Sequence, residues 1–126
     1  MNVIKEYETN KLLRELKQKK VIVTAGNVLV QQEKVDLFGI DRTLFEEIIV
    51  TKKGEKGKEY QRLQKRFGKF LVIGDRLADD LSEAKKLGGI TIHIRQGRGK
   101  LEPKNHPDVD YEIATIHELK GVLEKI

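Results

Sequence analysis

The stretch Phe70-Leu71-Val72-Ile73-Gly74-Asp75-Arg76-Leu77-Ala78-Asp79-Asp80 decides the fold of this chain. Its first four residues are an apolar run of strand length, which is typical of a strand buried on both faces of a sheet. The run ends at Gly74-Asp75, and apolar residues at helical spacing follow over residues 77–87. A strand, an acidic turn and a helix in this order predict one βα unit of a parallel sheet.

The rest of the chain repeats this alternation of strand and helix. We predict strands at 20–24, 45–50, 70–73, 90–94 and 110–113, and helices at 7–19, 28–38, 58–67, 77–87 and 116–125. Glu118 stands three residues after Thr115, which is the spacing of a capping box at the last helix. His93 alternates along its strand and is expected to be exposed or satisfied by hydrogen bonds. The pattern predicts a three-layer, doubly wound α/β fold with a mainly parallel, five-stranded sheet.

Composition narrows the class of protein further. The 126 residues correspond to one domain by length, and we expect a single α/β domain over 1–126. Cysteine is absent, which excludes disulfides and thiolate metal sites from this sequence. No apolar run approaches the ~20 residues of a membrane-spanning helix, so we expect a cytoplasmic protein without a membrane partner. Abundant Lys, Glu and Arg also fit the composition of a thermophile.

Polar side chains follow the strands at the edge where doubly wound sheets bind ligands. The first strand ends at Thr24, the loop after the second strand contains Lys56, and the third is followed by Asp75, Asp79 and Asp80. A hydroxyl and an ammonium group donate hydrogen bonds to phosphate, and carboxylates suit Mg²⁺. These residues predict a metal–phosphate site, although aspartates near a helix start also serve as ordinary caps.

The same residues resemble motifs of the haloacid-dehalogenase-like (HAD) hydrolase superfamily. Gly74–Asp80 is similar to its acidic fourth motif, GDxxxD or GDxxxxD, and Val21–Thr24 is similar to the second motif. Lys56 looks like the third-motif lysine, with Lys53 and Lys58 left as alternatives. The resemblance runs from about residue 11 to the C-terminus. It implies a HAD-like, Rossmann-type core without a cap, phosphate binding by Thr24 and Lys56, and Mg²⁺ binding by Asp75, Asp79 and Asp80.

The first motif of the superfamily is missing from the pattern. That motif, DxDx(T/V), provides the aspartate that forms a covalent intermediate, on a strand ahead of the second motif. Residues 1–19 contain no aspartate, and the carboxylates of Glu6, Glu8 and Glu15 follow no apolar strand. The resemblance therefore implies a phosphatase-like protein that is catalytically incomplete in this chain, unless an upstream segment or a partner chain supplies the nucleophile.

Loss of the nucleophile strand has a topological consequence. The superfamily sheet resembles the order 3-2-1-4-5 with a further strand at its edge, and the nucleophile strand is central. Without that strand, the renumbered order becomes 2-1-3-4-5, which obeys the right-handed crossover rule. We therefore expect strands 20–24 and 69–73 to be adjacent and parallel, with Thr24 facing Asp75.

Three functions are compatible with the sequence: a relative of Mg²⁺-dependent phosphatases, a non-catalytic module that binds a phosphorylated ligand or a partner, and a basic nucleic-acid-binding module. The net charge is +5, and residues 51–69 hold eight basic but only two acidic side chains. Few aromatic residues interleave with them as stacking platforms, which disfavours nucleic acid. The expected ligand is a phosphorylated small molecule, while a homo-oligomer or a complementing chain is left open.

Overall fold

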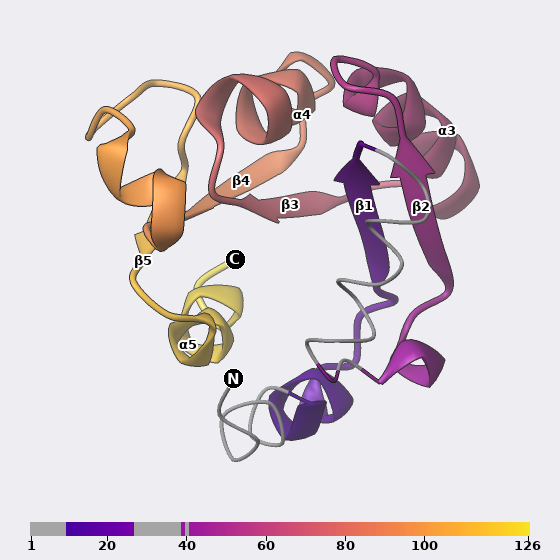
Figure 1. The fold of residues 1–126 in the computed structure, drawn as a ribbon. Coiled ribbons are helices and arrows are strands. Elements are labelled where there is room, and N and C mark those ends of the chain that lie inside the picture. Colours follow the sequence, from indigo (N-terminus) through magenta and orange to yellow (C-terminus); the bar gives the residue numbers. More distant parts are fainter. Residues whose placement is uncertain (1–9, 27–38, 40) are drawn as a thin grey trace. The chain divides into compact units, whose positions relative to one another are not determined.

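A computed structural model describes residues 10–26, 39 and 41–126 of the chain (Figure 1). The chain divides into two compact units, Met1–Glu55 and Lys56–Ile126. Each unit contains parallel strands and helices, which confirms the predicted α/β class. The helix predicted over residues 28–38 and the first residues of the one predicted over 7–19 lie outside the described residues.

The first unit contains two neighbouring strands. β1 (Val21–Ala25) and β2 (Glu47–Thr51) are parallel, with Val23 opposite Ile49. Both confirm predicted strands, shifted by one or two residues. A short 3-10 helix (Arg42–Leu44) precedes β2.

The N-terminal helix is shorter than its apolar spacing predicts. Residues 10–15 are helical, whereas residues 16–19 are not. The ammonium group of Lys20 donates hydrogen bonds to the carbonyl oxygens of Leu16 (2.7 Å) and Gln18 (2.9 Å). These carbonyls therefore find their partner in a side chain and not in a further helical turn, so the predicted helix end at residue 19 was wrong.

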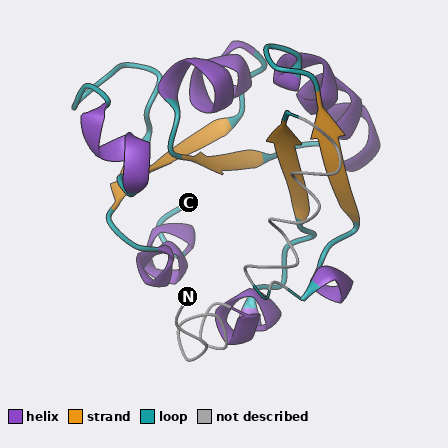
Figure 2. Ribbon diagram, viewed as in Figure 1, coloured by secondary structure: helices purple, strands orange, loops and turns teal. Residues whose placement is uncertain are grey.

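The second unit alternates strands and helices along its length (Figure 2). Its strands are β3 (Leu71–Gly74), β4 (Ile90–Ile94) and β5 (Tyr111–Ile113), and its α-helices are α3 (Lys56–Phe67), α4 (Glu83–Lys86) and α5 (Leu119–Leu123). A 3-10 helix (Gly97–Leu101) lies in the loop after β4, and another (Ile116–Glu118) leads into α5. The carboxylate of Glu118 accepts a hydrogen bond from the backbone N–H of Thr115 at 2.8 Å, as its capping position predicts.

The helix predicted over 77–87 begins as a π-helix. Leu77–Ser82 is π-helical and continues directly into α4. The backbone N–H of Leu81 donates to the carbonyl oxygen of Arg76, five residues earlier, at 3.4 Å. Such π-helical turns are rare and frequently lie at functional sites. Apolar periodicity alone could not distinguish this wider turn from an α-helix.

The core of the second unit lies around β4. Leu81, Ala84 and Ile92 are completely buried, and Leu63 and Tyr60 of α3 are nearly so. Figure 1 shows α4 on one side of the β3–β4–β5 sheet and α5 on the other, as in a layered α/β fold. In the part of the chain that the structure describes, no helix is long and apolar enough to cross a membrane.

The strand pairs agree with the predicted order as far as they extend. β1 pairs with β2, β3 with β4, and β4 with β5, and every pair is parallel. These are three of the four neighbour relations in the order 2-1-3-4-5. The fourth, between β1 and β3, would join the two units and stays a prediction.

Candidate functional site

The acidic motif lies where β3 ends. Gly74 is the last residue of β3, Asp75 follows it, and the π-helix starts at Leu77. A Cβ at position 74 would lie 2.6 Å from both the Cβ and the Oδ2 of Asp80. Only a glycine therefore lets the chain fold back so closely that Asp80 touches the end of the strand, which is the physical reason for glycine before the aspartate.

Lys56 pairs with the last aspartate of this motif. Its Nζ lies 2.5 Å from Oδ1 of Asp80, and the two side chains are 16% and 9% exposed. Oδ2 of Asp80 accepts a hydrogen bond from the backbone N–H of Arg76 at 3.2 Å. Because Lys56 is the first residue of α3, this ion pair connects the start of α3 to the acidic turn. Both oxygens of Asp80 are thus engaged within the protein.

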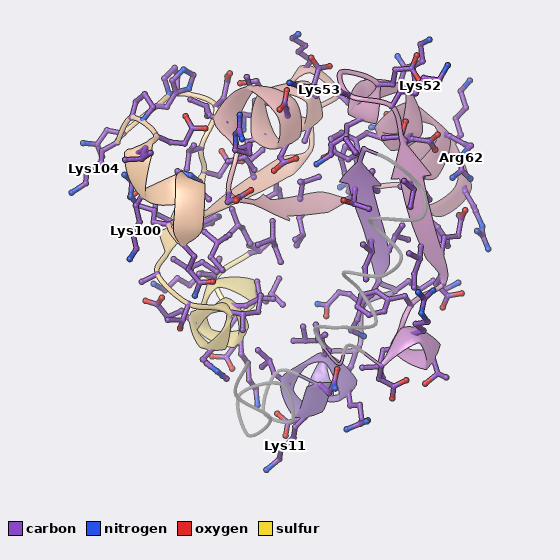
Figure 3. The ribbon with its side chains drawn as sticks, viewed as in Figure 1. Lys11, Lys52, Lys53, Arg62, Lys100 and Lys104 are labelled. Carbon is purple, nitrogen blue, oxygen red and sulfur yellow. The ribbon has the colours of Figure 1, made fainter. Side chains whose placement is uncertain are left out.

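The alternatives to Lys56 lie differently. Lys53 and Lys58 are exposed, and Figure 3 shows the side chains of Lys52 and Lys53 extending away from the ribbon. Lys56, in contrast, donates a hydrogen bond to Asp80 of the acidic motif. The geometry favours Lys56 as the lysine of the site.

Negative charge gathers around the start of α3. Burial raises the pKa of the Tyr60 phenol above its usual value of 10, and the carboxylates of Asp80, Glu83 and Asp79 raise it further. Tyr60 therefore stays neutral, and its ring packs near Phe70 with the ring centroids 6.2 Å apart. In this negative surrounding, the ammonium of Lys56 balances the charge of Asp80.

Asp75 and Asp79 differ from Asp80 in that their carboxylates are open. Both residues are half-buried, and neither carboxylate forms a hydrogen bond with another described residue. Carboxylate oxygens without a protein partner fit a hard cation such as Mg²⁺, whereas the engaged oxygens of Asp80 fit it poorly. Among residues 10–26, 39 and 41–126, no three acidic or histidine side chains come together to hold a metal ion. The joint metal set of Asp75, Asp79 and Asp80 stays a prediction.

His93 touches the main chain of Asp75 and was not predicted as a site residue. It is completely buried on β4, opposite Gly74, and its Nε2 lies 3.1 Å from the carbonyl oxygen of Asp75. The expectation of a satisfied histidine is met. A signal was present in the sequence, because a histidine in a strand buried on both faces needs a hydrogen-bond partner; the identity of that partner was not readable.

Thr24 lies in the other unit, near the end of β1 and opposite Val50. It is half-buried. Its predicted role in binding phosphate and its approach to Asp75 both stay predictions.

No family model matches the chain. Among curated proteins, it is 34% identical over 123 residues to a glyceraldehyde 3-phosphate phosphatase of Methanopyrus kandleri, covering 90% of this chain and 53% of that protein. A glyceraldehyde 3-phosphate phosphatase of Methanocaldococcus jannaschii is 29% identical over 129 residues, covering 94% and 56%. The chain thus spans about half the length of the curated relatives it matches.

Two crystal structures have a similar fold. The HAD-hydrolase YfnB of Bacillus subtilis, described as bound to magnesium, superposes with a TM-score of 0.69 at 24% identity, covering 90% of this chain and 51% of that one. A haloacid dehalogenase-like family hydrolase of Xanthomonas campestris superposes with a TM-score of 0.72 at 20% identity, covering 95% and 53%. Sequence relatives that are named phosphatases and fold neighbours that are HAD-type hydrolases therefore point to the same superfamily as the sequence motifs.

Proposed function

Since this chain has the fold of the haloacid-dehalogenase-like superfamily and resembles its core from the second motif onward, we propose that it carries the phosphate- and metal-binding part of a phosphohydrolase. The observation that supports this most directly is the Lys56–Asp80 pair beside the open carboxylate of Asp75. The pair supports the proposal because it brings an ammonium group to the acidic turn after β3, where the carboxylate of Asp75 has no hydrogen-bond partner among the described residues.

Lys56 is suited to binding a phosphoryl group. An ammonium group has three N–H donors, and Asp80 takes one of them. The others can be donated to phosphate oxygens, while Asp80 holds the side chain in place. We assign Asp80 to this positioning and leave Asp75, with Asp79, as the metal-binding carboxylates. The hydroxyl of Thr24 would donate a further hydrogen bond to the phosphate. A bound Mg²⁺ would neutralise charge on the phosphoryl oxygens.

The names of the curated relatives support a proposal for the substrate class. They act on glyceraldehyde 3-phosphate according to their names, so the proposed substrate of the complete enzyme is a small phosphorylated carbon compound of this kind. Residues ahead of β1 contain no aspartate. The nucleophile of the reaction would accordingly come from a polypeptide segment or subunit outside residues 1–126, and the described chain would bind its ligand without completing the reaction.

Ligand-dependent unfolding tests the binding role. With Mg²⁺ present, inorganic phosphate at ten times its Kd should stabilise the chain by about 1.4 kcal/mol, which raises the thermal midpoint by about 3–6 °C. Lys56→Met and Asp75→Asn should abolish this increase, because each removes a group that binds phosphate or metal. Lys58→Met, a change of the same kind at an exposed position two residues further along α3, should keep it.

The outcome that would contradict the proposal is a phosphate effect of equal size in Lys56→Met and in the wild type. Lys56→Met leaves the carboxylate of Asp80 buried and unpaired, so the double variant Lys56→Met/Asp80→Asn should be measured as well. It removes both charges and keeps the test valid if the single variant unfolds.

A turnover assay distinguishes the competing functions. The chain alone should not hydrolyse an aryl phosphate or glyceraldehyde 3-phosphate in the presence of Mg²⁺. Hydrolysis that is lost in Asp75→Asn would show that the chain is a complete enzyme and that the proposed incompleteness is wrong. Steeply salt-dependent binding to RNA that is unchanged by Asp75→Asn would favour the basic nucleic-acid module instead.

A further inference from the structure

His93 is completely buried, and both nitrogens of its ring have a hydrogen-bond partner. Its Nε2 lies 3.1 Å from the carbonyl oxygen of Asp75, and its Nδ1 lies 3.4 Å from Nη1 of Arg95. A guanidinium group can only donate hydrogen bonds, so Nδ1 must be the acceptor in this pair. The proton of the neutral ring is then on Nε2, which donates to the carbonyl oxygen of Asp75. Both contacts are satisfied by one tautomer only.

Arg95 is itself held in place. Its Nη2 donates to the carbonyl oxygens of Lys100 (3.2 Å) and Glu102 (2.9 Å), and its Nη1 lies 3.7 Å from the carboxylate of Glu112. The guanidinium side chain is only 16% exposed. The loop after β4 therefore orients Arg95, and Arg95 in turn fixes the ring of His93.

The loop after β4 also contacts the acidic turn directly. Oε1 of Glu102 accepts a hydrogen bond from the backbone N–H of Leu77 at 3.1 Å. A Cβ at Gly99 would lie 3.1 Å from the carbonyl oxygen of Asp75 and 3.2 Å from its Cβ, so the backbone of the loop lies directly against this residue. The main chain of Asp75 is thus held by His93 and approached by Gly99, whereas its carboxylate has no partner among the described residues.

We infer that His93 is a positioning residue for Asp75: it holds the main chain of Asp75 in place and thereby fixes the point from which the carboxylate reaches a cation. This inference rests on the proposed function, in which Asp75 binds the metal. Groups that orient a metal ligand typically contribute 10–100-fold to metal affinity. A carboxylate on a turn without such support would spend part of its binding free energy on ordering the turn.

Two measurements on the full chain test the inference. Long-range ¹H–¹⁵N spectra of the imidazole, recorded without metal, should show His93 protonated at Nε2 and bare at Nδ1. Titration with Mn²⁺, followed by its paramagnetic resonance, should show a Kd about tenfold weaker for His93→Leu than for the wild type. His93→Gln retains an N–H donor at the position of Nε2 and should recover most of the affinity. His117→Leu, the same change outside this cluster, should leave the Kd unchanged.

The positioning role of His93 and the metal-binding role of Asp75 can be contradicted separately. Protonation at Nδ1, or equal Mn²⁺ affinity in His93→Leu and the wild type while Asp75→Asn loses binding, would overturn the positioning role alone. Unchanged affinity in Asp75→Asn would contradict the proposed metal role of Asp75. The tautomer measurement uses the wild-type chain without metal. It therefore tests the His93–Asp75 hydrogen bond even if Asp75 does not bind metal or if His93→Leu does not fold.

Discussion

Gly74 has a role at the residue scale that its neighbours on β3 do not share. Its backbone φ is not in the left-handed region, so conformational freedom is not what the position needs. What it needs is space, because Asp80 occupies the volume where a Cβ would lie. The glycine at position 74 and the aspartate six residues later are therefore required together, because the two residues are in direct contact.

Gly74→Ala should destabilise the folded chain by about 1–3 kcal/mol, the usual cost of inserting a methyl group into a close contact. Asp80 would have to move, and its ion pair with Lys56 would weaken. Urea unfolding measures the effect. Gly121→Ala in α5 is the matched control, since nothing lies within 4 Å of the added Cβ. It should leave stability unchanged or raise it by up to about 1 kcal/mol. Equal stability of both variants would refute the steric explanation.

The predicted site residues differ in how far the sequence could define them. Asp75 and the spacing of the aspartates after it could be predicted from the sequence, because the acidic motif directly follows an apolar run of strand length. The choice among Lys53, Lys56 and Lys58 was not readable, because one helical turn moves an ammonium group by several ångströms and the sequence does not state where a helix begins. α3 begins at Lys56 and not at residue 58, and this difference brings Lys56 to Asp80.

At the scale of elements, a polar cluster joins β4, β5 and α4. Asp110 lies just before β5, and its Oδ2 accepts a hydrogen bond from the backbone N–H of the completely buried Thr91 at 2.9 Å. Its Oδ1 accepts one from the ammonium group of Lys85, near the end of α4, at 2.7 Å. The backbone N–H of Asp110 donates to the hydroxyl of Thr91 at 3.0 Å. These contacts attach the short strand β5 to the sheet in addition to its own ladder with β4.

Asp110→Ala should cost about 1–3 kcal/mol of unfolding free energy, because it leaves the buried N–H of Thr91 without its side-chain acceptor. Lys85→Met removes only the ion pair, whose side chains are 37% and 29% exposed, and should cost less than about 1 kcal/mol. Chemical denaturation of both variants compares the two contributions. A larger effect of Lys85→Met would show that the ion pair, and not the hydrogen bond to the backbone, holds β5.

The same carboxylate predicts a pH dependence. Burial raises the pKa of Asp110, but the hydrogen bonds from Lys85 and Thr91 and the charge of Lys85 lower it by more, so it lies below the ordinary value of 3.8. A lowered pKa in the folded state contributes stability above pH 3.8, and this contribution is lost as the pH falls through the folded pKa. The stability difference between wild type and Asp110→Asn should shrink over that acidic range in urea titrations. A difference that stays constant down to low pH would contradict it.

At the scale of the whole molecule, the predicted strand order concerns the edge of β3 that does not pair with β4. The predicted order 2-1-3-4-5 places β1 there, whereas an inserted strand would roughly double the spacing from about 4.8 Å to about 10 Å. The chain has no native cysteine, so engineered pairs report this without background.

The pair Lys20→Cys/Lys69→Cys marks positions one residue ahead of β1 and two residues ahead of β3. If the strands are adjacent, it should form a disulfide readily under mild oxidation, as read by gel mobility. The control pair Lys20→Cys/Glu46→Cys joins known neighbours, since the backbone N–H of Glu46 donates to the carbonyl oxygen of Lys20 at 2.8 Å. Cross-linking in the control but not in the test pair would exclude the predicted order and favour a strand supplied by another segment or chain.

The sequence by itself determined the α/β class, five strands to within two residues, their parallel pairing in three of four neighbour relations, and the acidic turn with Asp75. These features depend on local periodicity and on spacing along the chain, which a sequence displays directly. Tertiary structure decided the partner of Asp80, the π-helical start at Leu77 and the burial of His93 against Asp75. Each of these depends on contacts between residues 18 to 25 positions apart or on backbone geometry within one turn, which no local pattern of hydrophobicity encodes.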